Sequence, residues 1–147
     1  MHKTYFKKFL FVDSFNLNDL SVLNKNIDII FRNYKKHDVR TLQKIHNFCK
    51  KTNRKLYLSN NVRLALKLNL DGAYIPSFNK QINCIKYSLK KKILIIGSAH
   101  NSHEINIKLA QKCSLIFVSS LFKTNKSKKY LDIIRFNLLT LNYKDIF

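Results

Sequence analysis

Glycine and proline are scarce in this sequence, which contains two glycines, one proline and no tryptophan in 147 residues. The phosphate-binding loops of P-loop NTPases and of dinucleotide-binding folds need several closely spaced glycines. No such loop occurs, and neither a G-x-S-x-G nucleophile elbow nor an H-E-x-x-H zinc motif is present. Enzyme classes that depend on those motifs are therefore excluded.

Cysteine and long hydrophobic runs are also sparse. Cys49, Cys84 and Cys113 are odd in number, far apart and without C-x-x-C spacing, so we expect buried free thiols rather than a disulfide framework or a zinc site. No apolar run approaches the roughly eighteen residues that span a bilayer. The run Phe9–Val12 is too short for a signal peptide. We therefore expect a cytoplasmic protein without a membrane span.

Acidic residues are few, with 8 Asp and Glu against 28 Lys and Arg, which gives a formal net charge of +20. Proteins that read bases favour arginine, and single-strand binders place aromatic side chains among cations. Here the basic residues are mostly lysine, spread from Lys3 to Lys144, and the aromatic residues fall within apolar runs. Nucleic acid is therefore not the expected partner, although the charge favours anionic ligands.

Short apolar segments alternate with amphipathic ones along the chain. Strands are predicted at 7–13, 27–34, 55–58, 72–75, 93–96 and 115–118, with the start of a seventh at 145–147. Helices are predicted at 39–49, 62–68, 105–113 and 130–141, with a short helix or loop at 16–26 and a basic helix or loop at 79–92. This alternation is typical of parallel α/β architecture.

The number of βα units decides between two parallel folds. A doubly wound sheet usually has a glycine-rich first turn, which is missing here. A (β/α)8 barrel typically needs more than about 200 residues, and this chain contains about six of the eight βα units. We therefore predict that residues 1–147 form a single, incomplete TIM-type barrel domain, and that the sequence is a fragment of a longer reading frame or forms a homo-oligomer.

Five segments carry strand-end motifs in chain order. They are Ile30–Arg32, Ser59–Ala65, Leu70–Pro76, Ile95–His100 and Ser114–Thr124. Their order and spacing resemble the Q-x-R, N-D-x-x-x-x-A, D-G-v-H-L, G-x-S-a-H and D-y-v-x-x-(S/G)-P-v-F-p-T motifs of the thiamine phosphate synthase/TenI family. The resemblance implies a (β/α)8 barrel, in which ligands bind at the carboxyl ends of the strands.

The family's reaction gives three hypotheses for function. The first is a synthase-like transferase in thiamine biosynthesis, which joins hydroxymethylpyrimidine diphosphate to thiazole phosphate and releases pyrophosphate. The second is a TenI-like thiazole tautomerase, which needs no magnesium. The third is a non-catalytic relative that binds phosphorylated ligands. The implied partners are in each case a phosphorylated pyrimidine or thiazole.

The resemblance also implies the site residues. Arg32, Ser98 and His100 are the expected catalytic residues, because Arg32 could bind the diphosphate and the other two fall near the pyrimidine. Substrate and phosphate binding are expected from Arg32, Asn60, Tyr74, Ser98, Thr124, Ser127 and Lys128.

The implied cofactor is Mg²⁺, held in the family by two acidic residues. Asn60 and Asn79 stand at those positions here, and an amide is a poorer magnesium ligand than a carboxylate. This substitution weakens the expectation of magnesium and favours the tautomerase hypothesis.

Overall fold

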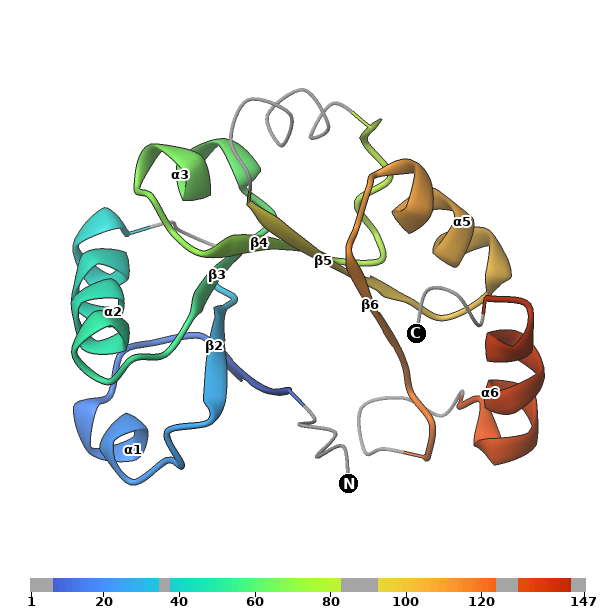
Figure 1. The fold of residues 1–147 in the computed structure, drawn as a ribbon, viewed down its shortest axis with the longest axis horizontal. Coiled ribbons are helices and arrows are strands. Elements are labelled where there is room, and N and C mark those ends of the chain that lie inside the picture. The colour runs from blue at the N-terminus through green and yellow to red at the C-terminus, as the bar shows by residue number, and fades with distance from the viewer. Residues whose placement is uncertain (1–6, 35–37, 83–92, 124–129, 144–147) are drawn as a thin grey trace, which may run out of the picture. The chain divides into compact units, whose positions relative to one another are not determined.

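A computed structural model of the chain describes residues 7–34, 38–82, 93–123 and 130–143. Strands and helices alternate along the chain (Figure 1), and the hydrogen-bonded strand order follows the sequence, β1-β2-β3-β4-β5-β6. Neighbouring strands are parallel in the pairs β1–β2, β2–β3 and β5–β6. The predicted parallel α/β architecture is confirmed.

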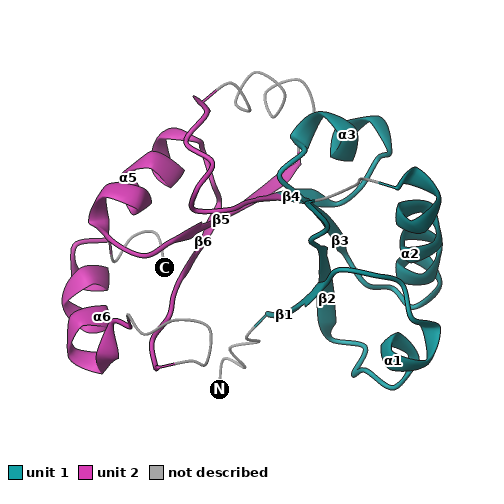
Figure 2. Cartoon of the chain, turned by 180° about the vertical axis from the view of Figure 1, so that it is seen from behind, with its two compact units in different colours: residues 1–73 teal, residues 74–147 magenta. Residues whose placement is uncertain are grey.

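The contacts divide the chain into two compact units, Met1–Ala73 and Tyr74–Phe147 (Figure 2). The first unit contains β1 (Lys8–Val12), α1 (Leu17–Ser21), β2 (Ile27–Phe31), α2 (Val39–Lys51), β3 (Leu56–Ser59) and α3 (Val62–Lys67). Strand β4 (Gly72–Ile75) crosses the boundary, and the second unit continues with β5 (Leu94–Ala99), α5 (Ser102–Ala110), β6 (Leu115–Val118) and α6 (Asp132–Leu141). The prediction of a single domain over 1–147 stays a prediction.

The first unit is built on strands that are buried on both faces, as parallel strands usually are. All four residues of β3 are buried, and so are the last three of β2. Helix α2 covers them with Leu42, Ile45 and Cys49, which recur at helical spacing and are almost fully buried. Asp38 caps the start of this helix, because its carboxylate accepts a hydrogen bond from the Arg40 amide at 3.0 Å.

The second unit depends on a close approach of α5 to β5. A Cβ atom at Gly97 would lie 2.9 Å from both the Lys108 Cδ and the Cys113 Sγ, so only glycine fits there. The Lys108 side chain runs through this space and is fully buried. Because successive strand residues point to opposite faces, Ser98 lies on the face of β5 opposite α5.

Two predicted strand boundaries are wrong. Strand β5 runs to Ala99 rather than ending before Gly97, because the ladder to β6 continues through the pairs Ser98–Phe117 and Ala99–Val118. Strand β2 ends at Phe31, where its pairing with β3 stops, and not at 34. The predicted seventh strand and most of the predicted segment 79–92 lie outside the described residues.

The helices of the described segments are short compared with the thickness of a bilayer. The longest is α2, with 13 residues. In this part of the chain no helix is long and apolar enough to cross a membrane.

Candidate functional site

In the first unit, Arg32 lies at the carboxyl ends of β1 and β2. The register pairs Val12 with Phe31, so the next residues on each strand, Asp13 and Arg32, lie side by side. The Arg32 Nε is 3.5 Å from an Asp13 carboxylate oxygen, and its guanidinium carbon is 4.9 Å from the centre of the Phe11 ring. Both charged side chains are partly exposed, at 38% and 68%. Such an exposed pair contributes little to stability, so an anion could replace the Asp13 contact at small cost.

Further polar side chains follow the neighbouring strands of the same unit. Asn33 donates a hydrogen bond to the Asp13 carbonyl at 3.3 Å, and the Ser59 hydroxyl donates to the Tyr34 hydroxyl at 3.3 Å. Asn60 follows β3, is exposed and has a left-handed backbone with φ of 60°. The ends of β1, β2 and β3 in this unit therefore present one guanidinium, the carboxylate of Asp13 and several neutral hydrogen-bonding groups.

In the second unit, Tyr74, Ser98 and Phe117 form a small cluster. The Tyr74 hydroxyl donates to the Ser98 hydroxyl at 2.8 Å, and both residues are buried. The Tyr74 and Phe117 rings are 6.1 Å apart, and Phe117 pairs in register with Ser98. Since Ser98 accepts from Tyr74, its own hydroxyl proton can be donated to a ligand.

His100 follows β5, and both of its ring nitrogens have a partner. Nδ1 contacts the Ser119 carbonyl, which follows β6, and Nε2 is 3.2 Å from the Ser77 hydroxyl, which follows β4. A carbonyl can only accept, so Nδ1 must carry the proton, and Nε2 of a neutral ring must accept from Ser77. The His100 amide donates to Glu104 at 2.7 Å, which supports the start of α5 at Ser102.

The turn that carries Ser77 is held from behind by a buried lysine. The Asn79 amide closes the turn by donating to the Pro76 carbonyl at 3.1 Å. The Lys108 ammonium donates to these residues' carbonyl oxygens, at 2.8 Å for Pro76 and 2.7 Å for Asn79, and to the Gln111 side chain at 2.9 Å. Gln111 in turn donates to the Asn79 carbonyl at 3.0 Å. The backbone on either side of Ser77 is therefore fixed.

The residues at the two predicted magnesium positions do not suit that ion. The Asn79 side-chain oxygen accepts from the Gln81 amide at 2.9 Å, and the Asn79 carbonyl already contacts the Lys108 ammonium. Asn60 offers an amide in place of a carboxylate, and magnesium is usually held by carboxylates and phosphates. Over the described segments, no group of three or more His, Cys, Asp or Glu side chains could hold a metal.

The predicted site residues therefore fall into two groups. Arg32 and Asn60 lie at strand ends of the first unit, while Tyr74, Asn79, Ser98 and His100 lie in the second. The predicted residues Thr124, Ser127 and Lys128 lie outside the described segments.

The sequence-based prediction missed Ser77, Lys108 and Gln111. The one signal for Ser77 was a hydroxyl directly after the predicted fourth strand and Pro76. Lys108 had no signal of its own in so basic a chain.

Comparisons with known proteins support the fold. The family model described as thiamine monophosphate synthase matches residues 23–141, which is well over half of the chain. Thiamine phosphate pyrophosphorylase from Pyrococcus furiosus superposes with a TM-score of 0.57 at 13% identity, covering 78% of this chain and 56% of that chain. The chain thus spans little more than half the length of that protein. The predicted TIM-type fold is confirmed. No curated protein sequence matches significantly.

Proposed function

Because the chain belongs to the thiamine monophosphate synthase family, we propose that it acts in thiamine biosynthesis on phosphorylated heterocycles. The first form of this proposal is a synthase-like transferase. Such an enzyme joins hydroxymethylpyrimidine diphosphate to thiazole phosphate. The bond between the methylene carbon of the pyrimidine and the diphosphate oxygen breaks, pyrophosphate leaves with the electron pair, and the thiazole nitrogen bonds to that methylene carbon. The observation that carries it is Arg32, a half-exposed guanidinium at a strand end.

The residues of this chain have distinct roles in that reaction. The planar guanidinium of Arg32 matches the oxygens of a diphosphate and stabilises the charge that develops on it as it leaves. Ser98, held by Tyr74 at 2.8 Å, offers a hydroxyl proton to a ring nitrogen of the pyrimidine. These roles involve hydrogen bonding and charge stabilisation by the chain's own side chains.

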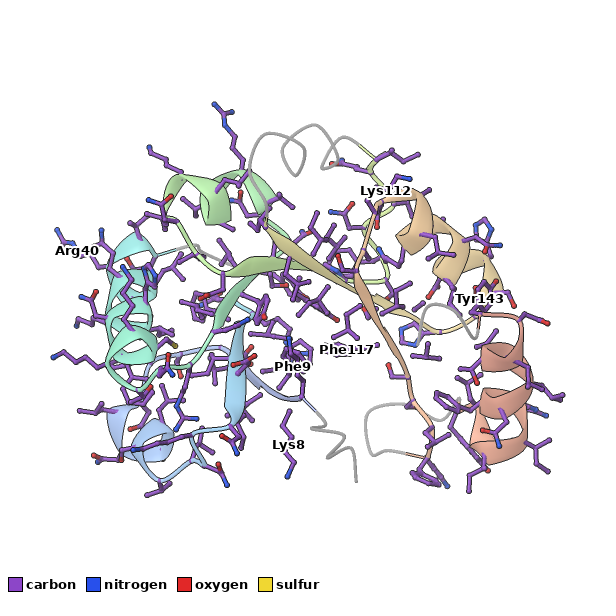
Figure 3. All side chains as sticks on the ribbon, viewed as in Figure 1. Lys8, Phe9, Arg40, Lys112, Phe117 and Tyr143 are labelled. Carbon is purple, nitrogen blue, oxygen red and sulfur yellow. The ribbon has the colours of Figure 1, made fainter. Side chains whose placement is uncertain are left out.

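The test is formation of thiamine phosphate by the purified protein with both substrates, with and without added magnesium. We expect product from the unsubstituted chain and a large loss in Arg32→Ala. Arg40→Ala is the matched control, because Arg40 is exposed on the outer side of α2 (Figure 3). Absence of product, or equal rates in both variants, would overturn the synthase proposal.

A second candidate is the thiazole tautomerase, which two observations favour. Asparagine replaces both acidic ligands, and His100 is held with a ring nitrogen that can accept a proton. Isomerisation of a thiazole carboxylate phosphate moves a proton and releases no diphosphate. We expect this activity to survive EDTA, whereas a magnesium-dependent synthase would lose its turnover.

A third outcome would indicate binding without catalysis. If neither product forms, calorimetry with thiazole phosphate separates a specific site from a generally basic surface. Binding that saturates and persists in salt would support a non-catalytic relative, because affinity for a merely basic surface falls steeply with salt.

A further inference from the structure

His100 offers no unoccupied ring nitrogen to a ligand. Nδ1 is bound to the Ser119 carbonyl, and Nε2 is bound to the Ser77 hydroxyl at 3.2 Å. A ligand that exchanges a proton with this imidazole must either displace Ser77 or pass the proton through its oxygen. The backbone on either side of Ser77 is fixed by the buried ammonium of Lys108, so the residue does not move away as a whole and its hydroxyl stays within reach of Nε2.

We propose that Ser77 is a catalytic residue, and that Ser77 and His100 form a hydroxyl–imidazole proton relay in which the Ser77 oxygen meets the ligand. The proposal rests on the proposed function, in its tautomerase form. It assigns a role to Ser77, which belongs to none of the five motif segments and follows the last residue of β4 by two positions.

The proton balance of the relay is simple. The substrate's acidic proton passes to the Ser77 oxygen while the Ser77 proton passes to Nε2 of His100, which gives an imidazolium ion. The Ser119 carbonyl stabilises that ion through the Nδ1 proton. Return of the proton to another atom of the same substrate reverses both transfers and leaves an isomer, so no oxidant, reductant or co-reactant is consumed.

The surrounding geometry suits a relay better than a purely structural contact. The Ser77 hydroxyl contacts a side chain on another strand end, 23 residues away, rather than its own turn. The turn itself is already closed by the Asn79 amide and held by Lys108 and Gln111. Stability of the turn therefore does not depend on the hydroxyl.

The main test follows the exchange of the substrate proton for deuterium in thiazole carboxylate phosphate, measured by NMR in deuterated buffer. We expect Ser77→Ala to lower the exchange rate constant by about 10²-fold with little change in KM, as removal of an acid–base group does. Ser77→Thr keeps the hydroxyl and should retain most of the rate. Ser114→Ala, at an exposed serine of the same unit, should leave it unchanged.

A second readout does not depend on turnover. Nitrogen-15 NMR of the free protein should find neutral His100 with its proton on Nδ1 in both the unsubstituted chain and Ser77→Ala. A proton on Nε2, or unchanged exchange in Ser77→Ala, would overturn the relay.

The two proposals can fail separately. If the unsubstituted chain neither exchanges nor isomerises the substrate, the proposed function fails. The contact of Ser77 and His100 with a ligand is then tested by NMR and by binding measurements, with thiazole phosphate as the probe. Chemical-shift changes at Ser77 and His100, with weaker binding by Ser77→Ala, would support it as a ligand contact, and no change at either residue would overturn it.

Discussion

The strand ends of the two units differ in how they hold positive charge. In the first unit the cation is Arg32, half exposed beside an exposed carboxylate. In the second it is Lys108, fully buried, with three oxygen partners that are all uncharged. An exposed guanidinium can exchange one anion for another, whereas a buried ammonium cannot leave its carbonyl oxygens without a large cost. The first cation is therefore suited to binding, and the second to fixing the backbone near His100.

The largest expected effect is the loss of stability on removal of the buried Lys108 ammonium. Lys108→Met keeps the apolar stem but removes the ammonium from the Pro76 and Asn79 carbonyls and from Gln111. Hydrogen bonds from a charged donor contribute about 1.5–3 kcal/mol each, while the Pro76 and Asn79 carbonyls each keep one other donor. We therefore expect urea unfolding to show a loss of about 3 kcal/mol. The exposed control Lys112→Met should change stability by less than about 0.5 kcal/mol. Equal effects in the two variants would refute the role given to Lys108.

The second effect separates binding from proton transfer. Arg32→Ala should weaken binding of a diphosphate ligand by roughly 10–100-fold, since hydrogen bonds to charged groups contribute about 1.5–3 kcal/mol. Its effect on unfolding should stay near zero, because its pair with Asp13 is exposed. His100→Asn should show the opposite pattern, with binding kept and turnover lost. Calorimetry measures ligand binding, and initial rates measure turnover. The same pattern of losses in both variants would contradict the separate roles given to Arg32 and His100.

The third effect compares two buried tyrosines. Tyr74→Phe removes the 2.8 Å donor to Ser98 and should cost about 1 kcal/mol. Tyr57 lies in the first unit, and its buried hydroxyl has no partner among the described residues. Tyr57→Phe should therefore leave stability unchanged or raise it by up to about 1 kcal/mol, since an unpaired polar atom is removed. Denaturant titration of both variants measures these changes, and an equal loss of stability in the two would contradict the prediction.

The fourth effect is the smallest at neutral pH, because it appears only in alkali. Burial raises the pKa of the Cys49 thiol from its ordinary 9.0 to about 12. Above pH 9 the unfolded thiol loses its proton while the folded one keeps it, so the free energy of unfolding falls as pH rises from about 9 to about 12. Burial also raises the pKa of Tyr57, with the same sign. In Cys49→Ala, the free energy of unfolding should fall less steeply above about pH 9, while its pH dependence near neutrality stays unchanged. Denaturant titrations at a series of pH values measure this, and the same alkaline slope in both proteins would argue against a buried thiol.

Most of the fold could be predicted from the sequence because its elements follow simple periodicities. The runs at 55–58, 72–75 and 115–118 match β3, β4 and β6 to within one residue. The polar end of β5 could not be predicted from hydropathy, because Ser98 is accommodated in the strand by a hydrogen bond from a distant tyrosine. The family resemblance supplied Arg32, Tyr74 and Ser98.

The rest of the candidate site is tertiary in origin. Ser77 is recognised as a site residue only through its contact with His100, 23 positions later. Lys108 meets its carbonyl partners 29 and 32 positions earlier, across a glycine that leaves room for its stem. Neither relation follows a helical or strand period, so no local pattern could indicate it.

The burial of Lys108 gives this chain an internal reporter. Every other lysine in the described segments is exposed, and all of those amines should react readily with acetylating or methylating reagents. Lys108 should react only when the turn after β4 opens, so mass spectrometry of labelled peptides would count such openings directly. Trypsin should likewise cleave after Lys108 late in native digests, and a ligand held at His100 should delay that cut further.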